Sequence, residues 1–252
     1  DTASAVAAVP ARGNDWAFLS SGTWSLLGVE AKQPILTKAA LAANFTNEGG
    51  VGKTFRFLRN ITGLWTLQQC QKVWMGKFPC SYDDLVAMAG KAPHSKSYID
   101  PDHPSFLNPP DMPEAIRNFC RSTGQPVPDS PDRIVRCLLE SLVLKYRTVL
   151  GQLGTISGRS IRRLHVIGGG SKNGLLCQWT ADACGIPVLA GPVEATSIGN
   201  ILMQALALGE LRSIDMVREV VRNSFELTLY EPVEPGIWDG KHGRFMECCG
   251  AA

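Results

Sequence analysis

The sequence has 252 residues and a formal net charge of +2, from 25 Lys and Arg against 23 Asp and Glu. Hydrophobic residues make up 44% of the chain and charged residues 19%, which excludes collagen-like, disordered and coiled-coil proteins. No stretch approaches the ~18 consecutive apolar residues of a membrane helix, and no basic tail suggests nucleic acid. We therefore expect a globular protein with a full core and neither a membrane nor a nucleic-acid partner.

The start of the chain and its cysteines add further expectations. The sequence begins at Asp1 without an initiator Met, which favours a piece of a longer chain; with no targeting segment in view, we expect a cytoplasmic protein. The eight Cys form no CxxC pair, and the four His do not stand at zinc-ligand spacing from them, so free thiols are expected. Cys120 and Cys137 would meet if their two helices pair, and the sequence leaves a disulfide between them open.

The first two thirds of the chain predict a hairpin followed by helices. Two apolar runs within residues 16–30 flank a Ser/Gly turn, which predicts strand–turn–strand, and alternation over 54–58 predicts a third strand. A proline-rich stretch over 93–111 predicts an irregular loop. Residue type and apolar spacing predict helices over 2–9, 64–75, 82–92, 111–122 and 129–153.

The last third alternates strands with helices. Strands are predicted over 164–167 and 187–190, and helices over 173–184, 197–208 and 214–225, the last with Ser213 as its N-cap. Antiparallel strands followed by βαβα units predict one α/β domain, a mixed sheet with helices on its faces. The end of the chain, with Cys248 and Cys249, is expected to fray.

Residues 49–54 (GGVGKT) imitate a phosphate-binding P-loop without meeting its pattern. GxxxxGK[ST] requires a glycine five residues before Gly52, where this sequence has Asn47. A P-loop also needs a helix after it to aim N–H groups at the phosphates, whereas the residues that follow favour a strand. We interpret the segment as a turn between strands; the alternative, a P-loop ATPase, would need Lys53 to bind ATP.

Three successive glycines, Gly168, Gly169 and Gly170, join a buried strand to a helix and form a stronger candidate. They remove every Cβ from the turn, so a flat or phosphorylated ligand can lie against bare backbone. The helix N-terminus beyond adds N–H donors and the positive end of a dipole. The pattern is not the GxGxxG of a dinucleotide-binding fold, and it fits either a nucleotide contact or a tight turn.

Three weaker segments carry polar groups at turns. Residues 20–23 (SSGT) place hydroxyls and a glycine at a hairpin bend, which suits phosphate oxygens but is common in ordinary turns. Residues 191–197 precede a helix that Thr196 or Ser197 is expected to cap. Residues 100–103 (DPDH) could be drawn as a metal site, but turn chemistry explains them better in a proline-rich loop.

Together these segments resemble the C-terminal half of the FGGY carbohydrate kinases. The resemblance runs from residue 1 to about Tyr230 and rests on the motifs DTASAV, SSGTWS, NEGGVG, FRFLRNITGLW, GGG with Asn173, ADACG and GPVEA. Lys53 departs from the family, where a glycine is expected. Residues 55–65 and 191–195 favour the branch that acts on L-rhamnulose over those that act on glycerol, xylulose or fuculose.

The resemblance implies an actin-like, ribonuclease H-like fold in two domains, with ATP and the sugar in the cleft between them. On this basis residues 1–252 are the C-terminal, ATP-binding domain, and the N-terminal domain is absent from this chain. The implied reaction, with Mg²⁺, transfers the γ-phosphate of ATP to the 1-hydroxyl of L-rhamnulose in L-rhamnose degradation. The isolated chain is expected to be inactive because both domains must close on the substrates.

The family's site residues carry over to this sequence one at a time. Asp1 matches the general base that takes the proton from the attacking sugar hydroxyl. Thr2 is expected beside the sugar, and Asn60 supplies an amide that suits a polyol. The implied ATP contacts are Thr23 at the phosphates, Gln68, the glycines Gly168, Gly169 and Gly170, and Asn173, and no metal ligand is assigned.

Two other functions stay open. The chain could belong to a kinase of another ketose or polyol in the same family, or it could be a non-catalytic nucleotide-binding module. The acid at Asp1 argues against the module, because a scaffold needs no base beside a cleft.

Overall fold

The structure, a computed structural model, describes residues 1–78 and 80–249. Its strands are β1 (Trp16–Ser21), β2 (Trp24–Ala31), β3 (Thr46–Gly49), β4 (Phe55–Thr62), β5 (Arg163–Ile167), β6 (Val188–Ala190) and β7 (Thr228–Tyr230). Its helices are α1 (Thr2–Ala7), α2 (Lys38–Ala42), α3 (Trp65–Trp74), α4 (Tyr82–Lys91), α5 (Met112–Ser122), α6 (Pro131–Ser157), α7 (Gly174–Cys184), α8 (Ala195–Ala207), α9 (Ile214–Ser224) and α10 (Pro235–Cys249), with short 3₁₀ turns η1 (Pro104–Phe106) and η2 (Gly169–Lys172).

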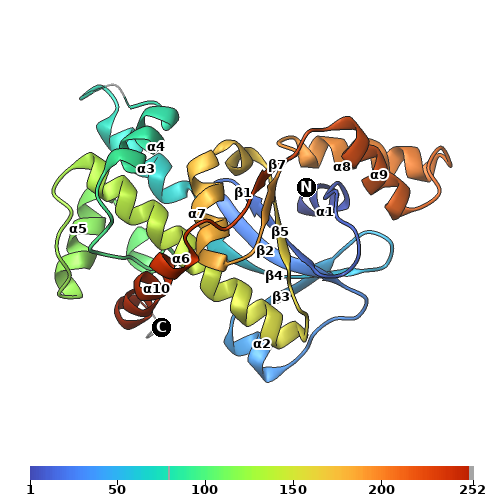
Figure 1. Ribbon diagram of the computed structural model, residues 1–252, viewed down its shortest axis with the longest axis horizontal. Coiled ribbons are helices and arrows are strands. Elements are labelled where there is room, and N and C mark those ends of the chain that lie inside the picture. Colours follow the sequence, from blue (N-terminus) through green and yellow to red (C-terminus); the bar gives the residue numbers. More distant parts are fainter. Residues whose placement is uncertain (79, 250–252) are drawn as a thin grey trace.

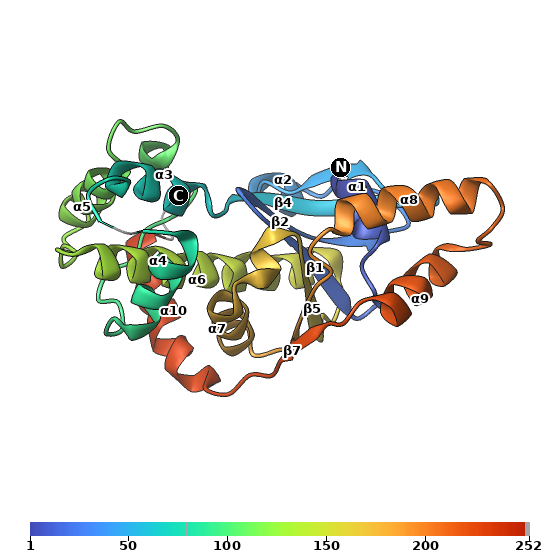
Figure 2. The ribbon, with the colours of Figure 1, turned by 90° about the horizontal axis from the view of Figure 1, so that it is seen from above.

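The strands form one mixed sheet in the order β3-β4-β2-β1-β5-β6-β7. β1 pairs antiparallel with β2 and parallel with β5, and β5 pairs parallel with β6 through the crossover helix α7. Helices α3, α4, α5 and α10 gather at one end of the molecule and α8 and α9 at the other, with the sheet between them (Figures 1 and 2). Among the described residues, no helix combines the length and apolarity needed to cross a membrane.

Alternation along the strands gives the sheet two apolar faces. Leu19 of β1 faces the larger core, which includes α6 and α7. Phe18 of β1, Leu58 of β4 and Ile167 of β5 face a smaller core with α1, α8 and α9. Because side chains two residues apart on a strand share a face, alternate residues of these strands belong to the two cores.

Helix α6 crosses the larger face of the sheet and ties the hairpin to it. Pro131 stands in its first turn, and Gly158 ends it in the left-handed conformation with a φ of 67°. The hydroxyls of the buried Tyr146 on α6 and of Ser25 on β2 are 2.6 Å apart and hydrogen-bonded. Burial raises the pKa of Tyr146, so this buried hydroxyl keeps its proton.

The end of the described chain is a helix, and the expectation that Cys248 and Cys249 lie in a frayed tail is wrong. Both belong to α10. Lys241 of α10 and Arg136 of α6 reach the same buried carboxylate, that of Glu140, with Lys241 Nζ 3.0 Å from Glu140 Oε1. A buried carboxylate is costly unless it is paired, so these contacts hold α10 against α6.

Most predicted elements are present with shifted ends, which confirms the α/β prediction. The hairpin, the helices and the alternating C-terminal segment occur where the apolar spacing places them. The sequence missed α2, β3, β7 and α10, and β4 is longer than predicted. The missed strands are three or four residues long, too short for alternation to stand out.

The two predicted helix caps have different outcomes. Ser213 does cap α9, because its hydroxyl accepts a hydrogen bond from the backbone N–H of Met216 at 3.2 Å. The cap predicted for α8 at Thr196 or Ser197 is wrong, since α8 begins at Ala195 and both residues already lie inside the helix.

The cysteines in the described residues are free thiols, as predicted. Cys120 on α5 and Cys137 on α6 are buried together, and the hydrogen bond between their side chains raises the pKa of the Cys137 thiol. Burial raises the pKa of Cys177 on α7 to about 12. The thiols of Cys137 and Cys177 therefore stay protonated near neutral pH and serve packing.

A buried histidine in β5 makes the fold sensitive to acid. His165 is 2% exposed, and neither of its ring nitrogens has a hydrogen-bond partner within the described residues. Its ring packs edge-on against Trp16, with 5.9 Å between the ring centroids. Burial, together with the charges of Arg163 and Arg218, lowers the pKa of His165 from 6.5 to about 4.

We predict that His165→Leu removes part of the acid sensitivity of the fold. The unfolded chain binds a proton at His165 below about pH 6.5, whereas the folded chain resists it down to about pH 4. The free energy of unfolding therefore has its full value above about pH 6.5 and falls by about 3 kcal/mol as the pH drops to 4. Urea unfolding across this range should show a smaller loss for His165→Leu. His103→Asn, at an exposed residue, should keep the loss, and equal slopes for wild type and His165→Leu would contradict the prediction.

Candidate functional site

Three loops meet at one edge of the sheet, where the parallel strands β1, β5 and β6 end. The hydroxyl turn (residues 20–23) closes β1, the glycine loop (residues 168–170) follows β5, and the proline loop (residues 191–194) follows β6. The N–H of Gly191 donates to the carbonyl of Val166 at 2.8 Å, which ties the proline loop to β5. Open α/β sheets bind ligands at the carboxyl ends of such strands.

The glycine loop lies directly against the hydroxyl turn. A Cβ on Gly170 would overlap the side chain of Ser21, and a Cβ on Gly168 would lie 3.0 Å from the Ser21 carbonyl oxygen. Gly168 also has a φ of 84°, a region that favours glycine. A Cβ on Gly169 would meet nothing within 4 Å. Gly168 and Gly170 are therefore needed for packing, whereas Gly169 leaves bare backbone facing open space.

Two of the predicted ATP contacts lie together at the hydroxyl turn. Thr23 Oγ1 donates to Gln68 Oε1 of α3 at 3.3 Å. The N–H groups of Leu64 and Trp65 donate to the carbonyls of Gly22 and Thr23 at 2.9 and 3.1 Å, so the start of α3 closes on the turn. Any ligand oxygen that reaches the Thr23 hydroxyl therefore also lies near the Gln68 amide.

A cavity of about 440 Å³ opens beside the glycine loop. Lys172 lines it from the end of this loop, the proline loop lines a second side, and Phe225 and Tyr230 line a third. The volume lies in the ~300–1,000 Å³ range of small-molecule sites. Aromatic and aliphatic walls with a lysine at one side suit a flat ring that carries a charged group.

Asn173, predicted as an ATP contact, has its side chain engaged within the protein. Its Oδ1 accepts from the N–H of Leu176 at 2.9 Å and caps α7, and its Nδ2 donates to the Tyr82 hydroxyl at 2.9 Å. The residue is 3% exposed. Asn173 therefore fixes the helix that follows the glycine loop, and any effect on a ligand passes through the position of that loop.

The predicted sugar residues lie on the α1 face of the sheet. Asn60 is exposed and stands two residues beyond Leu58 on β4, so it shares the face of the smaller core. Asp1 is exposed at the N-terminus of α1, where its carboxylate makes no hydrogen bond to the described residues, and Thr2 begins the helix. The structure thus places these three residues on one face and the predicted ATP contacts at the adjoining edge.

Helix α1 is held on this face by close packing against α8. A Cβ on Gly199 of α8 would overlap the carbonyl of Ser4, so the two backbones approach more closely than any side chain at residue 199 allows. Ala5 and Val6 of α1 are buried in the smaller core. This packing fixes the position of Asp1 at the start of the helix.

The P-loop imitation is a turn between β3 and β4, as the sequence analysis favoured. The N–H of Gly50 donates to the carbonyl of Thr54 at 2.9 Å, and β3 pairs antiparallel with β4. Lys53 has a φ of 62° in this turn. A strand follows the turn where a P-loop needs a helix, so the structure offers no helix N-terminus for phosphates here.

Residues 100–103 form a turn, and the carboxylates of Asp100 and Asp102 form ion pairs with a lysine side chain. Lys145 Nζ lies 2.7 Å from Asp100 Oδ1 and 3.1 Å from Asp102 Oδ2. Asp102 Oδ1 accepts from the N–H of Thr62 at 2.8 Å. Among the described residues, no group of three or more His, Cys, Asp or Glu is placed to hold a metal ion.

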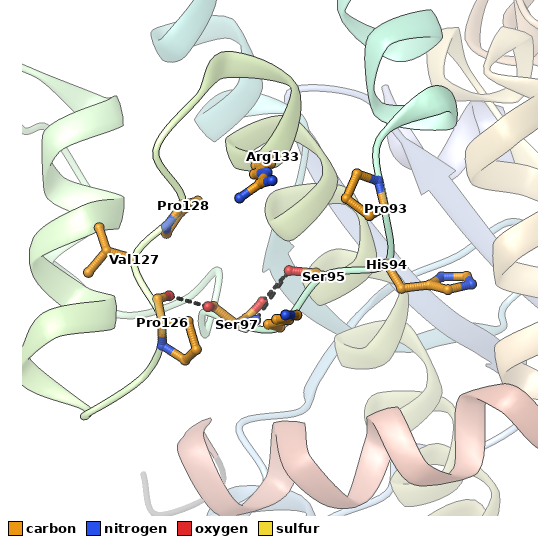
Figure 3. Close-up of a pocket in the computed structure, with 9 residues that line it drawn as sticks. Pro93, His94, Ser95, Ser97, Pro126, Val127, Pro128 and Arg133 are labelled. Carbon is orange, nitrogen blue, oxygen red and sulfur yellow. Dashed lines mark hydrogen bonds between the residues drawn. The ribbon is translucent and has the colours of Figure 1, made fainter.

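A second cavity, of about 350 Å³, lies among the helices at the other end of the molecule (Figure 3). The Ser95 hydroxyl donates to the Ser97 carbonyl at 2.7 Å, and the Ser97 hydroxyl donates to the Pro126 carbonyl. These polar groups join two loops and are already used. None of the predicted site residues lines this cavity, so it is not part of the candidate site.

The mixed sheet with helices on both faces has the actin-like ATPase fold. Solved sugar kinases share this fold. A xylulose kinase from Lactobacillus acidophilus superposes with a TM-score of 0.72 at 12% identity, over 97% of this chain and 49% of that one. A glycerol kinase with ADP from Plasmodium falciparum gives a TM-score of 0.66 at 14% identity, over 98% of this chain and 48% of that one.

Sequence comparison gives the family. The model of the FGGY family of carbohydrate kinases, C-terminal domain, matches residues 17–208, and this chain belongs to that family. A rhamnulokinase from Bacteroides thetaiotaomicron is 50% identical over 248 residues, which cover 98% of this chain and 50% of that protein. One from Enterococcus faecalis is 44% identical over 251 residues, with the same two coverages. The chain spans about half the length of the curated relatives it matches.

Sequence patterns did not point to three of the residues that line the cavity beside the glycine loop, Lys172, Phe225 and Tyr230. Tyr230 ends the short edge strand β7, Phe225 precedes this strand, and Lys172 follows the glycines. The signal for Lys172 was its position directly before the predicted helix. Phe225 and Tyr230 carry no such signal, because only the pairing of β7 with β6 brings them to the site.

We predict that Gly170→Ala destabilises the fold and that Gly169→Ala does not. The Cβ at residue 170 collides with Ser21, whereas at 169 it points into open space. Gly170→Ala should lower the free energy of unfolding by about 1–3 kcal/mol, and Gly169→Ala should change it by less than about 0.5 kcal/mol. Urea unfolding of both variants tests this, and equal losses would show that Gly170 is not held by the contact.

Proposed function

We propose that this chain is the C-terminal, ATP-binding half of a two-domain carbohydrate kinase that makes L-rhamnulose 1-phosphate and ADP from L-rhamnulose and ATP. The observation that carries the proposal is the 44–50% identity to rhamnulokinases over 98% of the chain, combined with the three loops at one edge of the sheet. The relatives are about twice as long, which supports a further domain N-terminal to Asp1. A cytoplasmic enzyme of sugar breakdown fits this assignment.

In this proposal ATP lies along the sheet edge. The adenosine enters the cavity of about 440 Å³, with Gly169 as its bare backbone platform. The phosphates extend toward the hydroxyl turn, where the Thr23 hydroxyl and the Gln68 amide, joined at 3.3 Å, turn to meet their oxygens. Asn173 keeps the glycine loop in place by capping α7.

Asp1 serves as the general base in this proposal. Its exposed carboxylate, free of hydrogen bonds to the described residues, accepts the proton of the sugar 1-hydroxyl as this oxygen attacks the γ-phosphorus. Thr2 and the Asn60 amide bind other hydroxyls and orient the sugar. Phosphoryl transfer depends mainly on positioning and charge stabilisation, so a base fixed by the packing of α1 on α8 suits it.

Mg²⁺ enters the proposal as a companion of the ATP phosphates. Such ions neutralise the charge that develops on the transferred phosphoryl group. The described residues hold no group of three potential ligands, so we assign no ligand in this chain. Mg²⁺ commonly binds through one or two carboxylates plus substrate phosphates, an arrangement that would draw on ATP and the other domain.

Another ketose of the same family is the alternative substrate, and an assay decides between them. The full-length protein should phosphorylate L-rhamnulose with a kcat/KM at least about tenfold above that for other ketoses, measured as ADP release. A higher kcat/KM for D-xylulose or L-fuculose would replace the substrate and keep the kinase. No ATP-dependent turnover with any sugar would favour the non-catalytic module.

We predict that Asp1→Asn in the full-length protein lowers kcat by about 10²–10⁴-fold, because the amide cannot accept the proton. The KM for ATP should stay within about twofold, since Asp1 does not touch the nucleotide in this arrangement. Lys53→Ala is the matched control and should leave both values unchanged, as its turn is no P-loop. If Asp1→Asn turned over at the wild-type rate, Asp1 would not be the general base.

We predict that the purified 252-residue chain does not phosphorylate L-rhamnulose, because half of the closing site is missing. The test is ADP release with ATP and L-rhamnulose, with the full-length protein as the positive control. ATP-dependent turnover by the isolated chain would show that the chain carries a complete active site.

A further inference from the structure

Trp24 differs from the other tryptophans in the chain. Its side chain is 51% exposed, whereas Trp16, Trp74, Trp179 and Trp238 are buried and Trp65 is half-buried. The indole N–H of Trp65 donates to the Leu107 carbonyl at 3.2 Å, but that of Trp24 makes no hydrogen bond to residues 1–78 or 80–249. Exposing a large aromatic ring is unfavourable in water, so an exposed indole with a free donor fits a ligand.

The strand register places Trp24 next to the proposed sugar residues. Trp24 opposes Thr62, and two residues further on Leu26 opposes Asn60, so Trp24 and Asn60 are diagonal neighbours on one face. Ser20 opposes Leu26 on the other side, and the smaller core includes Leu26, so this is the face that carries α1 and Asp1. Diagonal neighbours in a sheet stand about 7–8 Å apart or closer, within reach of an aromatic ring.

The backbone that presents this indole is fixed. The N–H of Gly22 donates to the Trp24 carbonyl at 2.9 Å, and the N–H of Trp65 donates to the carbonyl of Thr23 at 3.1 Å. Ser25, the next residue, is tied to Tyr146 of α6 at 2.6 Å. A backbone held this firmly needs little further ordering when a ligand packs against the side chain that it carries.

We propose that Trp24 is the stacking platform for the ketose, a specificity-determining residue of the sugar site; this rests on the function proposed above. Hydroxyls on one side of the sugar bind the Asn60 amide, and the carbon chain, with its methyl group at C6, packs on the indole face. The free N–H is a donor for one further hydroxyl. Thr23 and Trp24 are consecutive in the chain. In this proposal Thr23 contacts the ATP phosphates and Trp24 contacts the acceptor sugar.

The test compares Trp24→Ala and Trp24→Phe in the full-length protein. Trp24→Ala should raise the KM for L-rhamnulose about tenfold, and Trp24→Phe should raise it less, because phenylalanine keeps an aromatic face. The KM for ATP should stay within about twofold for both. Leu41→Ala is the matched control, because Leu41 is also an exposed apolar residue but lies on α2. It should change neither KM value.

Intrinsic fluorescence gives a second readout. L-rhamnulose without ATP should change the emission of the wild type, and this change should be largely lost in Trp24→Phe. An unchanged KM for the ketose in both variants overturns the proposal. A parallel rise of both KM values also overturns it, because Trp24 would then contact the other domain. If the wild type phosphorylates no ketose at all, the proposed function itself has failed.

Discussion

The parallel pairing of β1 with β5 is the constraint on which the rest of the site depends. It brings the hydroxyl turn and the glycine loop to the same edge of the sheet. The two can pack closely because Gly170 has no side chain, which would overlap Ser21. β6 then adds the proline loop through the bond from Gly191 to Val166. A nucleotide site built from three separate loops works only if the strands beneath them hold a single register.

The sheet also separates two kinds of chemistry. Its carboxyl edge offers backbone, hydroxyl and amide groups, which suit phosphates and a nucleobase. Its α1 face offers a carboxylate at Asp1, an amide at Asn60 and an exposed ring at Trp24. The two regions meet at Thr23, which ends the hydroxyl turn, and Trp24, which begins β2. In the proposed reaction, the phosphoryl group is transferred near these two residues.

Much of the fold follows from local sequence patterns. The helices over the middle of the chain and the final βαβα segment follow from apolar spacing, and the false P-loop is excluded by Asn47 alone. The short strands β3 and β7 could not be predicted, since their few residues take strand form only by pairing with β4 and β6. α10 was missed because its anchor, the carboxylate of Glu140, lies about a hundred residues earlier in the chain.

The candidate site shows the same division. The glycines were found as a motif, but the motif could not show that Gly168 and Gly170 serve packing while Gly169 faces open space. Asn173 was assigned to ATP by resemblance, and its side chain caps α7. Asp1, Thr2 and Asn60 came only from the family pattern, because no spacing links the first residues of a chain to the sixtieth. Asn60 lies on its face through the register of β4, whereas Asp1 and Thr2 lie there through the packing of α1 in the smaller core.

Helix α6 joins the outer helices at one end of the molecule to the sheet. Its 27 residues measure about 40 Å, and it carries Glu140, which anchors α10 among the outer helices, and Tyr146, which supports the hairpin under the hydroxyl turn. One continuous helix therefore supports both the anchor of α10 and the strand that follows the hydroxyl turn.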